Sequence, residues 1–200
     1  MRKNELEAKN ELNTIMEKGE IGQLGMIDSK GFPRVIPLNY VYIKESVYFH
    51  GALEGEKFEL SKYNPKVAFC VYIPFSTLPS YWMGKDNACP ASILYKSVHI
   101  KGRIEIIDDT EEKAFALQAI MEKYQPEGNY KPITTAEPIY KKELQRTGVF
   151  KITTIEVDVK AYMAQTKSET KRKELIKLLR ERNQSMDQES ADEIGKTLTE

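Results

Sequence analysis

Apolar residues recur with two different periods along this chain, and the period changes several times. Leu12, Ile15 and Met16 have helical spacing and Gly19 follows them, so residues 4–18 are predicted to form an amphipathic helix. Short apolar or alternating runs bounded by turn residues then predict strands. The predicted strands span residues 22–27, 34–43, 47–49, 66–72, 95–107 and 149–159.

Turn and cap residues separate these elements. Residues 28–31 and 44–46 predict tight turns, so the first three strands are expected to form an antiparallel meander. Pro37 inside the second strand predicts an edge, a bulge or a point where the ladder yields to a ligand. Further helices are predicted at residues 56–63, after Asp109 and following the segment 125–138, whereas residues 74–94 are expected to be irregular.

The composition of the chain changes after Ser168. Basic residues there surround a narrow stripe formed by Leu175, Leu178 and Leu179, which predicts an amphipathic helix, and residues 184–200 are expected to be a polar, frayed tail. We therefore expect two parts, residues 1–165 and residues 166–200. A solvated surface helix or a docking arm is favoured over nucleic-acid binding for the second part.

The order of elements predicts a fold class. Short strands with interspersed helices, without β-α-β alternation, indicate a mainly β protein: a small antiparallel barrel with helices on its outside. A doubly wound sheet is not expected, because no G-x-G-x-x-G follows the first strand.

Composition excludes several classes of function. Thirty basic residues balance thirty acidic ones, so general attraction to nucleic acid or an anionic membrane is not indicated. No apolar run has the length of a membrane span, and the first residues lack the apolar segment of a secretory signal. Two cysteines and two histidines provide neither a disulfide framework nor a metal cluster. We expect a soluble, cytoplasmic protein without a metal site.

Residues 48–57 carry the strongest functional signal. An apolar strand ends at His50 and Gly51, Gly55 follows, and a helical pattern begins around Lys57. A glycine-bearing loop that opens onto a helix offers backbone N–H groups and a positive dipole to an anion. Lys57 in the first helical turn adds a full positive charge, so this junction is predicted to bind a phosphate-bearing cofactor.

An ordered set of short motifs resembles a known family. The motifs are GFPRVIPLNYVY at 31–42, VYFHGA at 47–52, Gly55-x-Lys57, N-P-x-V-x-F at 64–69, YKSV at 95–98 and Gly102-Arg103. Together they resemble the FMN-binding split-barrel superfamily, and within it the pyridoxamine-phosphate-oxidase-related branch that includes the nitroimidazole-resistance (Nim-type) proteins. The likeness covers residues 10–160.

The resemblance implies an antiparallel split β-barrel with flanking helices, and FMN held between two subunits of a homodimer. It places Arg34 near the phosphate, Lys57 on the phosphate, and Ser97 with Tyr95 at the pyrimidine edge of the flavin. The implied cofactor-binding residues are Arg34, Val35, Ile36, Pro37, Leu38, Asn39, Phe49, His50, Gly51, Lys57, Tyr95 and Ser97.

The activity expected from this resemblance is that of an FMN-dependent oxidoreductase. Electrons would pass from a reduced nicotinamide, NADH or NADPH, to a small flat acceptor such as a nitroaromatic. His50 is the candidate catalytic residue, as a proton donor or substrate contact, and a positioning role for it stays open. The alternative is a flavin- or haem-binding protein without turnover, with His50 and His99 as conceivable haem ligands. Oxidation of vitamin B6 is not expected, because residues 161–167 lack the Arg-rich, Trp- and Pro-containing segment of that branch.

Overall fold

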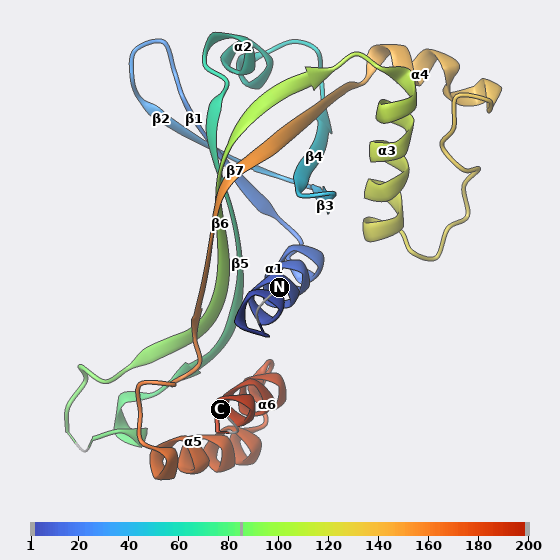
Figure 1. Ribbon diagram of the computed structural model, residues 1–200. Helices are drawn as coiled ribbons and strands as arrows, with labels where there is room; N and C mark the ends of the chain where they lie inside the picture. Colours follow the sequence, from blue (N-terminus) through green and yellow to red (C-terminus); the bar gives the residue numbers. More distant parts are fainter. Residues whose placement is uncertain (1–2, 85, 199–200) are drawn as a thin grey trace. The chain divides into compact units, whose positions relative to one another are not determined.

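The computed structural model describes residues 3–84 and 86–198. The chain divides into two compact units, Met1–Val71 with Val98–Asp158 and Tyr72–Ser97 with Val159–Glu200. The strands are β1 Gly22–Ile27, β2 Pro33–Leu38, β3 Val41–Ile43, β4 Ser46–Gly51, β5 Lys66–Leu78, β6 Ser92–Ile107 and β7 Gly148–Tyr162 (Figure 1). The helices are α1 Lys3–Lys18, α2 Glu56–Tyr63, α3 Thr110–Tyr124, α4 Lys141–Arg146, α5 Glu169–Arg182 and α6 Asp187–Lys196, with short 3-10 turns η1 Ser80–Trp82 and η2 Pro138–Tyr140.

One mainly antiparallel sheet has the strand order β2-β1-β5-β6-β7-β4-β3. The β1–β2 hairpin pairs Gly22 with Leu38, and the β3–β4 hairpin pairs Val41 with Tyr48. The predicted mainly β, antiparallel fold with flanking helices is confirmed. In this strand order β2 and β3 stand at the two edges, so the sheet is not closed.

The meander predicted for the first three strands is wrong. The apolar run 34–43 contains two strands, and these pair at opposite edges of the sheet: β2 with β1 and β3 with β4. The break falls at Asn39 and Tyr40. The Tyr40 side chain is fully buried, its hydroxyl donates to the Met16 carbonyl at 2.9 Å, and its N–H donates to the Tyr124 hydroxyl at 3.1 Å. Pro37 does lie on an edge strand, as predicted.

Two other segments are more regular than the sequence indicated. Residues 74–94 were expected to be irregular, but β5 continues to Leu78 and β6 begins at Ser92. Ser76 and Leu78 are buried within their own unit and Thr77 between them is exposed, so the end of β5 alternates as a strand does. The expected frayed tail contains α6, whose apolar side packs on α5. The boundary at residue 165 stays a prediction.

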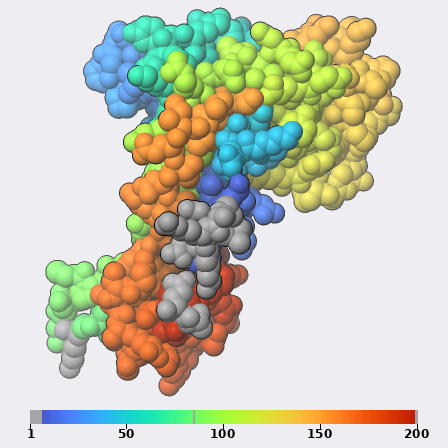
Figure 2. Space-filling model, viewed as in Figure 1, coloured from blue at the N-terminus to red at the C-terminus, as the bar shows by residue number. Residues whose placement is uncertain are grey.

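The first unit is built around an apolar core with α3 fastened to the sheet. Asp109 caps α3 by accepting from the Glu112 N–H at 2.7 Å, as the capping-box pattern predicted. The Glu112 carboxylate accepts from the Tyr48 hydroxyl at 2.8 Å and from Lys151 at 3.0 Å. Residues between α3 and α4, coloured yellow to gold, lie beside α3 (Figure 2). The Ile133 N–H of this segment donates to Gln118 Oε1 at 2.9 Å.

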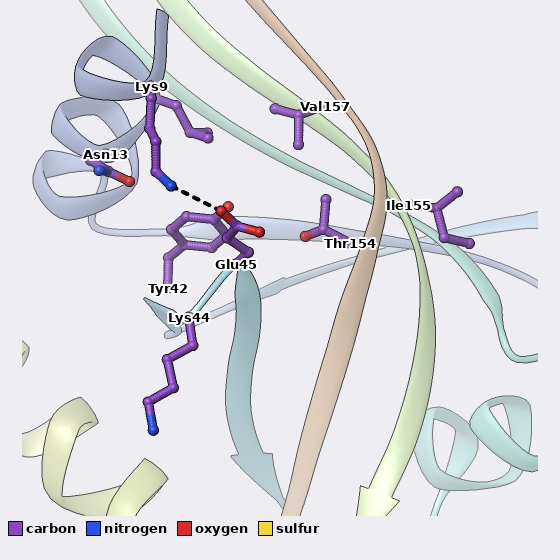
Figure 3. A pocket seen from close by; sticks show the side chains of 9 residues that line it. Lys9, Asn13, Tyr42, Lys44, Glu45, Thr154, Ile155 and Val157 are labelled. Atoms are coloured by element: carbon purple, nitrogen blue, oxygen red, sulfur yellow. Dashed lines mark hydrogen bonds and ion pairs between the residues drawn. The ribbon is translucent and has the colours of Figure 1, made fainter. Parts of the chain in front are cut away.

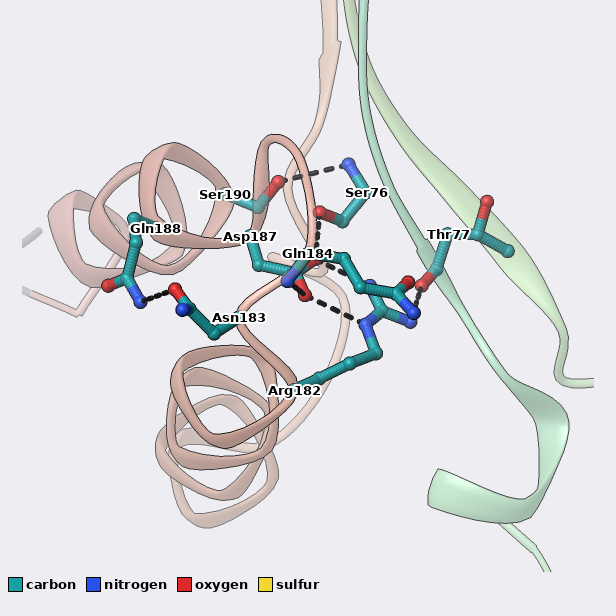
Figure 4. Close-up of polar contacts among 8 residues, drawn as sticks. All are labelled: Ser76, Thr77, Arg182, Asn183, Gln184, Asp187, Gln188 and Ser190. Atoms are coloured by element: carbon teal, nitrogen blue, oxygen red, sulfur yellow. Dashed lines mark hydrogen bonds and ion pairs between the residues drawn. The ribbon is translucent and has the colours of Figure 1, made fainter.

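The second unit has its own core around α5 and α6. Its buried apolar residues are Leu78, Leu94, Met163, Ala164, Leu175, Leu179, Ala191 and Ile194. At the centre of Figure 4 lies the fully buried side chain of Asp187, which binds Arg182 at 2.6 Å and accepts from the Ser76 hydroxyl at 2.5 Å. Within the described residues, no helix combines the length and apolarity needed to cross a bilayer.

Candidate functional site

The junction between β4 and α2 has the features expected of an anion site. Strand β4 ends at Gly51 and α2 begins at Glu56, after Gly55 with φ 86°. A φ in this range is open to glycine without steric cost. No side chain caps α2, and its first backbone bond runs from the Glu59 N–H to the Gly55 carbonyl at 3.1 Å. The N–H groups of the first turn and the helix dipole are therefore free of a side-chain cap and favour an anion.

Lys57 lies against the end of β4. Its ammonium is 5.2 Å from the Phe49 ring centroid and 5.3 Å from that of Phe150, and it approaches the His50 carbonyl at 3.5 Å. Gly51 permits this position, because a Cβ there would lie 2.4 Å from the ammonium nitrogen. Burial lowers the pKa of Lys57. The end of β4 and the first turn of α2 thus surround the Lys57 ammonium, and we call this arrangement the cradle.

Arg34 is brought to the same helical turn by an ion pair. Its Nε lies 2.8 Å from Glu56 Oε1, and its Nη2 donates to Glu56 Oε2 at 2.9 Å. Hydrogen bonding to Glu56 raises the pKa of Arg34. The two predicted phosphate-binding cations therefore reach α2 at successive residues, Arg34 through Glu56 and Lys57 directly.

His50 presents an exposed imidazole beside this cation. Partial desolvation lowers the pKa of His50, and the charge of Lys57 lowers it further. Both effects favour the neutral imidazole over the charged one. A neutral ring next to an ammonium can accept a proton or a hydrogen bond.

The remaining predicted residues of the first unit differ in exposure. On the edge strand β2, Val35 is 66% exposed, and Ile36 and Leu38 are partly buried. The Phe49 side chain is fully buried and stacks on Phe150, with centroids 5.0 Å apart and planes at 8°. Phe49 is thus a core residue, and only its backbone is left to contact a ligand at the end of β4.

Two hollows adjoin these strands. A groove of about 550 Å³ has Arg34, Val35 and Ile155 on its wall. It is otherwise lined mainly by apolar and basic residues: Gly25, Met26, Ile27, Pro33, Lys66, Val67, Ala68, Lys101, Gly102 and Arg103. A hollow of about 790 Å³ lies between α1, the β3–β4 turn and β7, where Lys9 pairs with Glu45 at 3.0 Å (Figure 3). The exposed apolar side chain of Ile155 lines both.

Tyr95 and Ser97 belong to the second unit. Tyr95 is 36% exposed and Ser97 is buried on β6. The cluster of Arg34, His50 and Lys57 is therefore built from the first unit alone. Across residues 3–84 and 86–198, no group of three or more His, Cys, Asp and Glu side chains is placed to hold a metal ion.

Comparison with known proteins identifies the family. Residues 8–161 match the family model described as pyridoxamine 5'-phosphate oxidase. The chain belongs to this family. The match, which includes β1 to β6, nearly all of β7 and the Arg34–Lys57 cluster, confirms the resemblance seen in the sequence, and the family binds flavin. A comparison with curated proteins finds no match.

Solved structures support the fold of this pyridoxamine 5'-phosphate oxidase family member. A Bacteroides thetaiotaomicron protein provisionally assigned to 5-nitroimidazole antibiotic resistance is 24% identical, with 76% of this chain and 82% of that chain covered and a TM-score of 0.60. The flavocytochrome Anf3 from Azotobacter vinelandii is 21% identical, with 77% and 67% covered and a TM-score of 0.64. An FAD and heme binding protein from Mycobacterium smegmatis is 14% identical, with 76% and 70% covered and a TM-score of 0.63.

Sequence reasoning missed one residue of the cluster. Glu56 sits between Gly55 and Lys57 in the sequence, and it is the partner of Arg34 in the structure. An acidic residue in a turn predicted to bind phosphate is unexpected, and this could have indicated that Glu56 has a cationic partner. Its partner, 22 residues earlier, was not visible without the fold.

Proposed function

We propose that this chain is an FMN-dependent oxidoreductase that works as a homodimer. The observation that carries the proposal is the arrival of Arg34 and Lys57 at the uncapped first turn of α2, in a chain of the pyridoxamine 5'-phosphate oxidase family. Guanidinium, ammonium and backbone N–H groups are the donors that a phosphate monoester prefers. When bound, FMN supplies transfer of a hydride or of electrons, here from NADH or NADPH to a small flat acceptor such as a nitroaromatic.

Each residue near the cradle has a role in this proposal. Lys57 and the first-turn N–H groups of α2 bind the phosphate, and the Arg34 guanidinium adds further N–H donors. Gly51 lets the Lys57 ammonium lie against the end of β4, because a side chain there would occupy the same space. The edge strand β2, with the exposed Val35, gives an apolar surface along which a flat ring can lie. His50 contacts the substrate and exchanges a proton at its imidazole.

Substitution of Lys57 tests the cofactor site. Lys57→Met should weaken FMN binding about tenfold or more, because a charge-assisted phosphate contact contributes roughly 1.5–3 kcal/mol. Lys62→Met is the control: Lys62 is in the last turn of the same helix, and its ammonium lies over the Phe58 ring at 3.6 Å. Fluorescence titration with FMN measures both. Equal FMN affinity in wild type and Lys57→Met would remove Lys57 from the site.

Spectroscopy tests the class of activity. Protein loaded with FMN should lose its visible flavin absorbance when NADH or NADPH is added without oxygen, and regain it with a nitroaromatic acceptor. Bound flavin that never bleaches would leave a binding protein without turnover. An intense Soret band in the purified protein would instead favour the haem-binding alternative.

Exposed apolar residues support the homodimer. Val35 and Ile155 are 66% and 67% exposed, and both line the groove beside β2. Ile155→Asp should shift the protein toward monomer in analytical ultracentrifugation, because a charge cannot be buried without a partner. Ile139→Asp, at a side chain that is 56% exposed on η2, is the control and should leave the dimer intact. A wild-type protein that sediments as a monomer would contradict the assembly. Cytoplasmic location stays a prediction from composition.

A further inference from the structure

Arg34, which binds the cofactor phosphate in the proposed function, is already paired with the carboxylate of Glu56. Glu56 takes two N–H groups of the guanidinium, at 2.8 and 2.9 Å, in a side-on bidentate geometry. The side chains of Arg34 and Glu56 are 49% and 50% exposed, so the pair is open to an incoming ligand. The cradle therefore contains an anion of its own.

The position of Glu56 matches the electrostatic requirements of a phosphate. Glu56 is the first residue of α2, where the helix dipole and the uncapped N–H groups favour negative charge. Its carboxylate faces a guanidinium, which binds carboxylates and phosphates with the same planar fork of donors. A phosphate that used this edge of Arg34 would meet the Glu56 charge directly, and like charges at such a distance repel.

We propose that Glu56 is an intramolecular competitor for the cofactor phosphate. Arg34 binds the Glu56 carboxylate in the free protein and exchanges it for the phosphate when FMN binds. This inference rests on the proposed function and adds one consequence to it: the affinity for FMN is set below what Arg34 and Lys57 allow, so the cofactor exchanges readily. If Glu56 instead only held Arg34 in place for the phosphate, its removal would weaken FMN binding, so the two roles differ in sign.

Removal of the Glu56 charge is the primary test. Glu56→Gln should bind FMN about threefold to tenfold more tightly than wild type, the range that a partly exposed charge contact gives. Riboflavin, which has the same ring without phosphate, should bind both proteins equally. Glu59→Gln makes the same change of net charge on the same helix, and its FMN affinity should change by less than about twofold. Flavin fluorescence gives all these affinities.

A double substitution separates competition from general electrostatics. In an Arg34→Gln background the gain from Glu56→Gln should largely disappear, because there is no guanidinium left to release. FMN binding by Glu56→Gln that is unchanged or weaker, or an equal gain for riboflavin, would overturn the competitor role.

The two proposals fail in distinguishable ways. Wild type that binds FMN, with no gain in Glu56→Gln, removes the competitor and leaves the cofactor. FMN binding in Glu56→Gln but not in wild type would support the competitor role and would mean that Glu56 outcompetes the phosphate. Absence of FMN binding in both proteins, each shown to be folded by circular dichroism, removes both proposals.

Discussion

At the scale of single residues, the charge of Lys57 should affect the pKa of His50, and this effect can be measured. Desolvation lowers the pKa of His50 first, and the Lys57 charge lowers it further. Lys57→Met removes the second cause, so the pKa of His50 should rise. NMR titration of the two imidazoles measures it, and a His99→Gln variant assigns the signals. A His50 pKa that does not move would mean that the Lys57 charge is not felt at the ring.

If His50 donates the proton during turnover, the same pKa fixes the pH dependence of the activity. The acid form of His50 is populated only below its lowered pKa, so turnover should increase as the pH falls through that value. Turnover measured against pH in wild type and His50→Gln checks this. A profile that is the same in both proteins would assign His50 a positioning role.

Two glycines predict opposite effects on stability. A Cβ at Gly102 of β6 would lie 2.4 Å from the Ile152 side chain and 2.8 Å from the Thr153 carbonyl oxygen, so Gly102→Ala should destabilise by about 1–3 kcal/mol. A Cβ at Gly195, inside α6, meets nothing within 4 Å, so Gly195→Ala should stabilise by about 0.5–1 kcal/mol. Urea unfolding measures both. Effects of the same sign would contradict the packing described for these sites.

The residues of the candidate site were only partly predictable. Lys57 was predicted from its residue type and its place at the start of a helix after a glycine loop, which are local signals, whereas Arg34 was implied by the family resemblance. Glu56 was missed because an ion pair between residues 22 positions apart depends on the fold. Phe49 was expected to bind the cofactor, but its side chain is in the core. Val47, Tyr48 and Phe49 are all buried, so strand alternation could not show which side faces the core.

At the scale of elements, the Tyr124 hydroxyl fixes the break between β2 and β3. It accepts from the Tyr40 N–H at 3.1 Å and donates to the Glu20 carbonyl at 2.7 Å. Tyr124→Phe should destabilise by about 1–2 kcal/mol and speed amide exchange at Tyr40, because that N–H loses its acceptor. Tyr140→Phe, which removes an exposed bond to the Lys131 carbonyl, is the control and should cost less than about 0.5 kcal/mol. Equal effects of the two changes on Tyr40 exchange would contradict the role of Tyr124.

The contact between Tyr124 and Tyr40 also shows which elements could be predicted from the sequence and which could not. Helices α1, α2 and α3 follow local signals: apolar spacing, a glycine or an Asp–Glu cap, and a terminating residue. The strand break at Tyr40 depends on a side chain 84 residues later, and nothing between residues 34 and 43 indicates it. Antiparallel hairpins were predictable from their turns, whereas their places in the sheet were not.

At the scale of the whole molecule, the family match covers most of the first unit and part of the second, but not helices α5 and α6. Residues 8–161 match the family, and α5 and α6 follow them. The basic residues of α5 are largely paired: Lys173 with Glu169, Lys177 with Glu181 and Arg180 with Asp192, at 2.5, 3.7 and 3.0 Å. These pairs are exposed, so each adds little to stability. That α5 does not bind nucleic acid stays a prediction, while its buried Leu175 and Leu179 pack in the core of the second unit.

The Asp187 cluster should give the second unit a characteristic acid sensitivity. Hydrogen bonding to Arg182 lowers the pKa of Asp187 from 3.8 to about 2. A lowered carboxyl pKa means that the stabilisation is complete above about pH 4, the value of the unfolded chain, and is lost as the pH falls through about 2. The shift corresponds to about 2 kcal/mol of unfolding free energy. Asp187→Asn should abolish this part of the pH dependence.

The same variant should be less stable at neutral pH. Asp187→Asn leaves the mostly buried Arg182 without its carboxylate, which should cost about 2–4 kcal/mol at pH 7. Trp82, the only tryptophan of the chain, lies 4.8 Å from the Arg182 guanidinium, so its fluorescence follows unfolding of this unit. Asp192→Asn breaks an exposed pair with Arg180 and should cost less than about 1 kcal/mol at every pH. Because the two changes remove the same charge from α6, a similar loss in both would mean that net charge, rather than the buried Arg182–Asp187 contact, stabilises the pair of C-terminal helices.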